Sequence, residues 1–114
     1  MEGLELARKT IEAASDKQAS GIVLLDARGK CSFTDYFVIC SGDSTRQLQS
    51  INDEIERVLK KEGVSPYHYE GTMDSGWIII DYGDVIVHIF APAEREFYKL
   101  DQLWGEAKPL VVIQ

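Results

Sequence analysis

The chain contains few cysteines, with two among its 114 residues. Cys31 and Cys40 lack the C-x-x-C spacing of zinc and redox motifs, so the sequence indicates neither a disulfide framework nor a cysteine-based metal site. A chain of this length builds one hydrophobic core without cross-links, which predicts a single domain over residues 1–114. We therefore expect both thiols to be reduced and partly buried.

Long hydrophobic runs are also absent. No apolar stretch approaches the roughly 20 residues that a membrane helix needs. The first residues show no basic region followed by an apolar one, and they are not rich in Arg and Ser, so neither a secretory signal nor a transit peptide is predicted. The expectation is a cytoplasmic protein with no membrane partner.

Basic residues are fewer than acidic ones, 12 against 19, which leaves a formal charge of −7. Proteins that bind nucleic acid usually carry a positive stripe, so direct, sequence-specific nucleic-acid binding is disfavoured. An acidic surface suits a basic protein partner, whose approach it steers. The alternative is that the acidity serves only solubility.

Apolar periodicity and turn residues divide the rest of the chain into elements. Ser44, with Gln47 three residues later, is the capping-box pattern that begins a helix. Pro66 favours an edge position for the strand around it. The pattern predicts helical segments at 3–17, 44–63 and 93–107, and strands at 21–26, 33–40, 64–69 and in both arms of 76–90.

The order α-β-β-α-β-β-β-α predicts an α/β (α+β) fold with a small mixed five-stranded sheet. The second arm of 76–90 is apolar on both faces, with Val85, Val87 and Ile89 on one and Ile86, His88 and Phe90 on the other. Strands of this kind lie centrally in a sheet. The tail 109–114 is apolar but too short to assign.

The segment 76–90 is the most informative part of the chain, because it predicts a hairpin. Gly83 suits the positive φ of a three-residue loop formed by Asp81, Tyr82 and Gly83. This loop would place Asp81, Tyr82 and Asp84 together at the hairpin tip, with Tyr82 exposed there as a candidate contact residue.

A nucleotide-dependent transferase is the rival interpretation. The helix start at Gly42 and Ser44 and the acids Asp81 and Asp84 are similar to parts of the nucleotidyltransferase architecture. However, the turn lacks the Lys of a P-loop, and the two aspartates straddle a turn instead of alternating on one strand face. We therefore predict no metal and no cofactor.

The histidines carry little catalytic signal. His68 and His88 are twenty residues apart and form no metal-ligand spacing. His88 lies among apolar strand residues, which favours a hydrogen-bonded core histidine over a catalytic base. A nucleophile pair between His88 and Cys31 or Cys40 stays open at this point.

Three long blocks resemble the signature of the Iojap family, the ribosomal silencing factors. The resemblance covers about residues 4–107, and its main departure is Asp43, where the family often has a small neutral residue. The blocks are 32–42 followed by 44–47, then 70–71 with 76–77 and 81–90, and finally 95–104.

The resemblance implies a translation regulator without enzymatic activity. Such factors bind the large ribosomal subunit through ribosomal protein fourteen and block joining of the small subunit when nutrients are scarce; isolated members often form homodimers. A dimeric scaffold without a ribosomal role is a third interpretation. Matching the blocks position by position predicts a partner-binding set of Trp77, Asp81, Tyr82, Asp84, His88, Tyr98 and Trp104.

Overall fold

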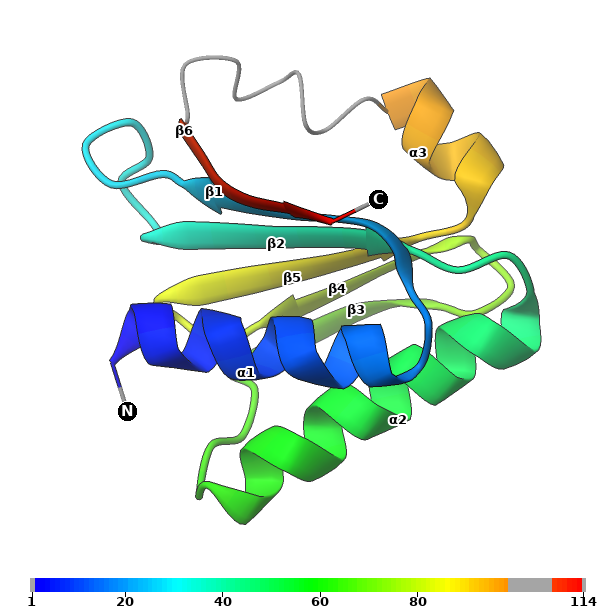
Figure 1. The fold of residues 1–114 in the computed structure, drawn as a ribbon, viewed down its shortest axis with the longest axis horizontal. Helices are drawn as coiled ribbons and strands as arrows, with labels where there is room; N and C mark the ends of the chain where they lie inside the picture. Colours follow the sequence, from blue (N-terminus) through cyan, green and yellow to red (C-terminus); the bar gives the residue numbers. More distant parts are fainter. Residues whose placement is uncertain (1, 99–107, 114) are drawn as a thin grey trace.

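Six strands form one mixed sheet in the order β3-β4-β5-β2-β1-β6 (Figure 1). The computed structural model describes residues 2–98 and 108–113, and only the backbone of residues 97, 98 and 108. The predicted mixed α+β fold is confirmed. The strands are β1 (Ser20–Asp26), β2 (Tyr36–Ser41), β3 (His68–Thr72), β4 (Trp77–Asp81), β5 (Val85–Phe90) and β6 (Lys108–Ile113).

Two long helices cover one face of the sheet, α1 (Gly3–Asp16) and α2 (Thr45–Lys61), and the short α3 (Pro92–Tyr98) lies on the opposite side (Figure 1). The Ser44 side chain accepts a hydrogen bond from the backbone N–H of Gln47 at 3.1 Å, which confirms the predicted N-cap of α2. The predicted helical segment 93–107 overlaps α3, and its part from 99 onward lies outside the described residues.

Arg95 connects α3 to the sheet through two hydrogen bonds. Its Nη1 donates to the backbone oxygen of Gly21 at 2.6 Å and to Oγ of Ser41 at 3.0 Å. Both acceptors lie at the ends of their strands, so a single side chain holds the helix against β1 and β2. None of the helices in the described part of the chain has both the length and the apolar character of a membrane span.

The prediction of five strands was wrong, because the tail adds a sixth. β6 pairs antiparallel with β1, from Ile22 opposite Ile113 to Asp26 opposite Lys108. Only the free edge of β1, more than eighty residues earlier in the chain, gives this short apolar tail a partner. The strand predicted at 64–69 begins later, at His68, and takes the predicted edge position.

The hairpin forms as predicted, but its loop differs. Asp81 still belongs to β4, and the backbone N–H of Tyr82 donates to the oxygen of Val85 at 2.9 Å. The loop is therefore Gly83 and Asp84, with a positive φ of 89° at Gly83. A positive φ confined to the first loop residue is the pattern of a type II′ turn, which matches the twist of the paired strands.

The sheet has an apolar cluster on each face, as the two-sided pattern of β5 predicted. Val85, Val87 and Ile89 belong to the large cluster beneath α1 and α2. The opposite side of the sheet, here called the second face, carries the smaller cluster, which consists of Leu25, Ala27, Phe37, Ile39, Ile86 and Phe90. His88 lies on this face by strand alternation.

Candidate functional site

Aromatic rings from three adjacent strands meet on the second face. Trp77 of β4 stacks on Phe90 of β5, its register partner, with ring centroids 5.0 Å apart. His88 stacks on Phe90 at 6.1 Å and lies 5.7 Å from Phe37 of β2. We call Phe37, Trp77, His88 and Phe90 the aromatic face. Phe37, His88 and Phe90 are buried and Trp77 is half-buried, so Trp77 is the member of this face that a partner can reach.

His88 is the polar member of the aromatic face. The Trp77 indole Nε1–H donates to His88 Nδ1 at 3.1 Å, and the residue is 6% exposed. Burial lowers the pKa of His88 to about 4, so the ring is neutral at pH 7. Because Nδ1 accepts, the neutral ring carries its proton on Nε2. That nitrogen is buried and has no hydrogen-bond partner among the described residues.

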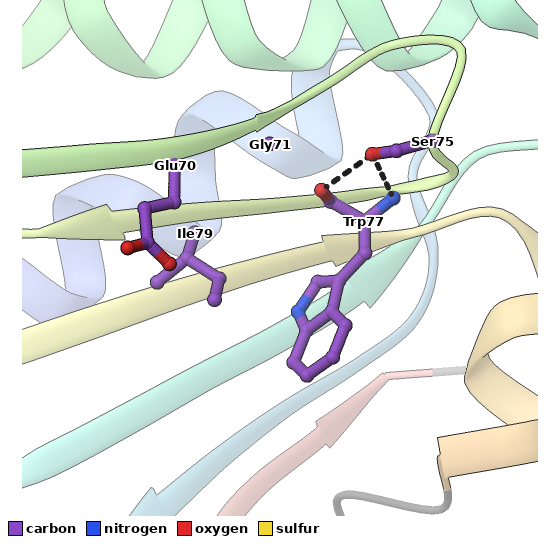
Figure 2. A pocket seen from close by; sticks show the side chains of 5 residues that line it. All are labelled: Glu70, Gly71, Ser75, Trp77 and Ile79. Carbon is purple, nitrogen blue, oxygen red and sulfur yellow. Dashed lines mark hydrogen bonds between the residues drawn. The ribbon is translucent and has the colours of Figure 1, made fainter.

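A pocket of about 360 Å³ adjoins the aromatic face at the β3 edge (Figure 2). We call it the edge pocket; it is lined by Glu70, Gly71, Ser75, Trp77 and Ile79. Glu70 is the register partner of Ile79, and Figure 2 shows both side chains on the same side of the strands as the Trp77 ring. Ser75 fixes the backbone of Trp77 by donating to its oxygen at 3.1 Å and accepting from its N–H at 3.4 Å.

The two aspartates of the hairpin serve different local purposes. The half-buried Asp81 uses Oδ1 to accept a hydrogen bond from the N–H of Gly83 at 2.7 Å, which stabilises the turn. Asp84 is exposed, and its backbone oxygen accepts from the N–H groups of Asp35 and Tyr36. This side chain is available at the surface, whereas that of Asp81 is partly committed to the turn.

The expectation that Tyr82 projects from the hairpin tip is wrong. It is 4% exposed and belongs to the large cluster beneath the helices. The two-residue loop begins after Tyr82, so strand alternation turns this side chain toward α1 and α2, away from the aromatic face. It lines a second cavity of about 310 Å³ with Leu6, Val64 and Tyr67 among its neighbours. Tyr82 is therefore a core residue.

The structure brings together part of the predicted set. Trp77 and His88 are in direct contact, and Asp81 lies on the same face, two residues beyond Ile79 on β4. Tyr98 is the last residue of α3, of whose side chain nothing is described, and Trp104 lies outside the described residues. Sequence reasoning missed Phe37, Glu70 and Ile79. These residues meet because of the pairing register between strands, and the spacing of residues within one strand does not reveal that register.

Two of the catalytic arrangements considered from the sequence are not formed by the described residues. Within residues 2–98 and 108–113, no group of three or more His, Cys, Asp or Glu side chains is placed to hold a metal. Cys40 is in the large cluster and His88 on the second face, so these two cannot form a nucleophile pair. Burial raises the pKa of the Cys40 thiol to about 12, which keeps it protonated. Cys31 packs against the smaller cluster.

Comparison with known proteins identifies the family. The family model described as "Ribosomal silencing factor during starvation" matches residues 1–114. The chain belongs to the ribosomal silencing factors. It is 38% identical over 107 residues to the ribosomal silencing factor of Halalkalibacterium halodurans, covering 94% of this chain and 92% of that one. The family resemblance read from the three sequence blocks is confirmed.

Two further relatives extend the comparison. A crystal structure of a protein from Chromobacterium violaceum superposes with a TM-score of 0.88 at 33% identity, covering 100% of this chain and 95% of that one. A mouse protein named for mitochondrial assembly of the ribosomal large subunit is 34% identical over 91 residues, 77% of this chain and 40% of the relative. These family names describe a ribosome-associated regulatory factor and no enzymatic reaction.

Proposed function

We propose that this protein binds the large ribosomal subunit through ribosomal protein fourteen and blocks joining of the small subunit. Translation would thereby be repressed when nutrients are limiting. Membership of the silencing-factor family supports the ribosomal role, and the name of the mouse relative supports the choice of the large subunit. The site of action is the cytoplasm, where subunits join.

The observation that carries the proposal is the aromatic face beside an acidic strand edge. Trp77 and Phe90 form a stacked pair, and two acids lie on the same side of the strands, Glu70 on β3 and Asp81 on β4. An aromatic centre with charged residues around it is the usual composition of a protein interface. The acidic charges suit a basic ribosomal protein, and they would repel exposed RNA phosphates.

We assign the central contact to Trp77, whose indole the buried His88 holds in place, and a rim contact to Asp81. Asp84 keeps its predicted contact role at the hairpin tip, where it lines the second cavity with Tyr82. Tyr98 and Trp104 keep their predicted place in the contact region. The protein acts by steric exclusion and needs no chemical step, in line with the neutral His88 and the protonated Cys40. A homodimer of the free protein is compatible with this mode of action.

The decisive experiment adds the protein to purified ribosomal subunits and separates them on a sucrose gradient. We expect a smaller joined-ribosome peak and co-sedimentation of the protein with the large subunit. An unchanged peak at excess protein would refute subunit anti-association. Absence from the large-subunit fraction would favour the dimeric scaffold.

Charge reversal on the surface tests the site. Asp84→Lys should weaken co-sedimentation several-fold, because a positive charge at a hairpin tip that faces a basic partner would repel it. Asp43→Lys is the matched control, since Asp43 is also exposed but lies at the start of α2. If both variants bind equally well, Asp84 is not part of the contact.

A further inference from the structure

Basic side chains are missing from one continuous part of the chain. There is no Lys or Arg between Lys61 and Arg95, a stretch that contains all of β3, β4 and β5. The same stretch carries the acids Glu62, Glu70, Asp74, Asp81, Asp84 and Glu94. Most of the formal net negative charge therefore falls within this stretch, and all residues that line the edge pocket belong to it.

The edge pocket joins a carboxylate to an aromatic ring. Glu70 is exposed on β3, and Trp77 is half-buried on β4, two residues from the register partner of Glu70. Diagonal neighbours on paired strands lie about 7–8 Å apart. One flat cationic group can therefore contact both the Glu70 carboxylate and the Trp77 ring, the two walls of the pocket. Ile79 supplies its apolar floor.

The indole side of the edge pocket is held in place before any ligand binds. The Trp77 ring is stacked on Phe90 and hydrogen-bonded to His88, so its β5 side is covered and its β3 side lines the pocket. Glu70 is exposed, with His68 Nε2 2.9 Å from its Oε1, a surface contact that orders the carboxylate only weakly. The preorganised indole wall reduces the ordering that binding would otherwise require.

We infer that the edge pocket binds an arginine side chain of a basic protein partner. A guanidinium stacks on an indole and donates two parallel hydrogen bonds to a carboxylate, so it satisfies both walls at once. A lysine ammonium is a compact, strongly hydrated charge and uses this geometry less well. An anionic ligand would meet Glu70 without a cation among the residues lining the pocket. That the arginine belongs to a ribosomal protein rests on the proposed function. That the pocket binds an arginine side chain rests only on the residues that line it.

A small probe tests the pocket directly. The ¹⁵N-labelled full chain is titrated with Nα-acetyl-arginine methylamide, and the Trp77 Nε1–H and Ile79 amide signals are followed. We expect saturable shifts in the range of about millimolar affinity, and at least about tenfold weaker binding of the neutral citrulline analogue. Equal binding of the two compounds, or no shift at Trp77 with the arginine compound, would overturn the inference.

Removing the carboxylate gives the matched comparison. Glu70→Gln should weaken binding of the arginine probe about tenfold or more, because the charge-assisted bonds are lost. Asp74→Asn removes an exposed acid from the adjoining turn, outside the pocket lining, and should change binding less than about twofold. Equal effects of the two variants, or none from Glu70→Gln, contradict an arginine site.

Sedimentation with large ribosomal subunits separates this inference from the proposed function. If the wild-type chain binds the arginine probe but not the subunits, the ribosomal proposal fails and the pocket stands. If it binds the subunits but the probe leaves Trp77 unmoved, the pocket inference fails alone. When both hold, Glu70→Gln should also weaken subunit binding while Asp74→Asn does not.

Discussion

The indole N–H of Trp77 donates to Nδ1 of His88 on the neighbouring strand at 3.1 Å. The register partner of His88 is Ile79, so the bond runs diagonally across the β4–β5 pair. The same indole stacks on Phe90. One hydrogen bond and one ring stack therefore hold the indole of Trp77, the half-buried member of the aromatic face, in a single orientation.

A double-mutant cycle should reveal this bond. Trp77→Phe and His88→Phe should each lower the free energy of unfolding by about 1 kcal/mol, because each leaves one end of the bond without its partner, either the buried His88 Nδ1 or the half-buried indole N–H. The coupling between the two should be about 1 kcal/mol, measured by urea unfolding. Strictly additive effects would show that the bond contributes nothing to stability.

The buried histidine predicts a pH-dependent stability. The pKa of His88 is lowered to about 4 in the folded protein, whereas an unfolded histidine titrates near 6.5. Between these values the unfolded chain binds the extra proton. The free energy of unfolding should therefore fall as the pH is lowered from about 6.5 to about 4, by up to about 3 kcal/mol from this group.

Two histidine variants isolate that contribution in urea titrations at pH 7 and pH 4.5. His88→Phe should lose this part of the pH dependence, and His68→Gln should keep it, because His68 is exposed on β3. If His88→Phe retains the full slope of the wild type, other groups account for the acid sensitivity.

Tyr82 offers a test of its placement in the core. Its hydroxyl is buried with no partner among the described residues, so Tyr82→Phe should leave stability unchanged or raise it by about 1 kcal/mol. Tyr82→Ala should cost about 3–5 kcal/mol by leaving a cavity. Tyr67→Phe, at an 83% exposed position, is the control and should have little effect on thermal or urea unfolding.

Large-subunit binding provides a second measurement on Tyr82. Tyr82→Phe should co-sediment as the wild type does, because the side chain faces the helices and not the proposed contact surface. A marked loss of binding by this folded variant would place the hydroxyl at the interface after all.

Neighbouring valines in β6 test whether the tail is part of the sheet. Val111 packs against the large cluster, so Val111→Asp should lower the free energy of unfolding by about 2 kcal/mol or more. Val112 is 55% exposed, so Val112→Asp should change the free energy of unfolding by less than about 0.5 kcal/mol. Similar values for both variants in urea unfolding would argue against the β1–β6 pairing.

Much of the fold was predictable because the signals are local. The Ser44 cap and the apolar stripe after it mark α2, and alternation along β5 separates Val87 from His88. The predicted number of strands was wrong because β6 pairs with β1, which lies near the other end of the sequence. The predicted hairpin loop was wrong because a shift of one residue in the register moves Tyr82 from the turn into the strand pair.

The sequence by itself determined the family, the acidic charge and the periodicity of each element, because these depend on residue type and near-neighbour spacing. Only the tertiary structure decided which face of the sheet α1 and α2 cover, and hence that Tyr82 is buried while Trp77 meets His88. Strand alternation assigns side chains to two faces, but long-range packing chooses which face becomes the main core.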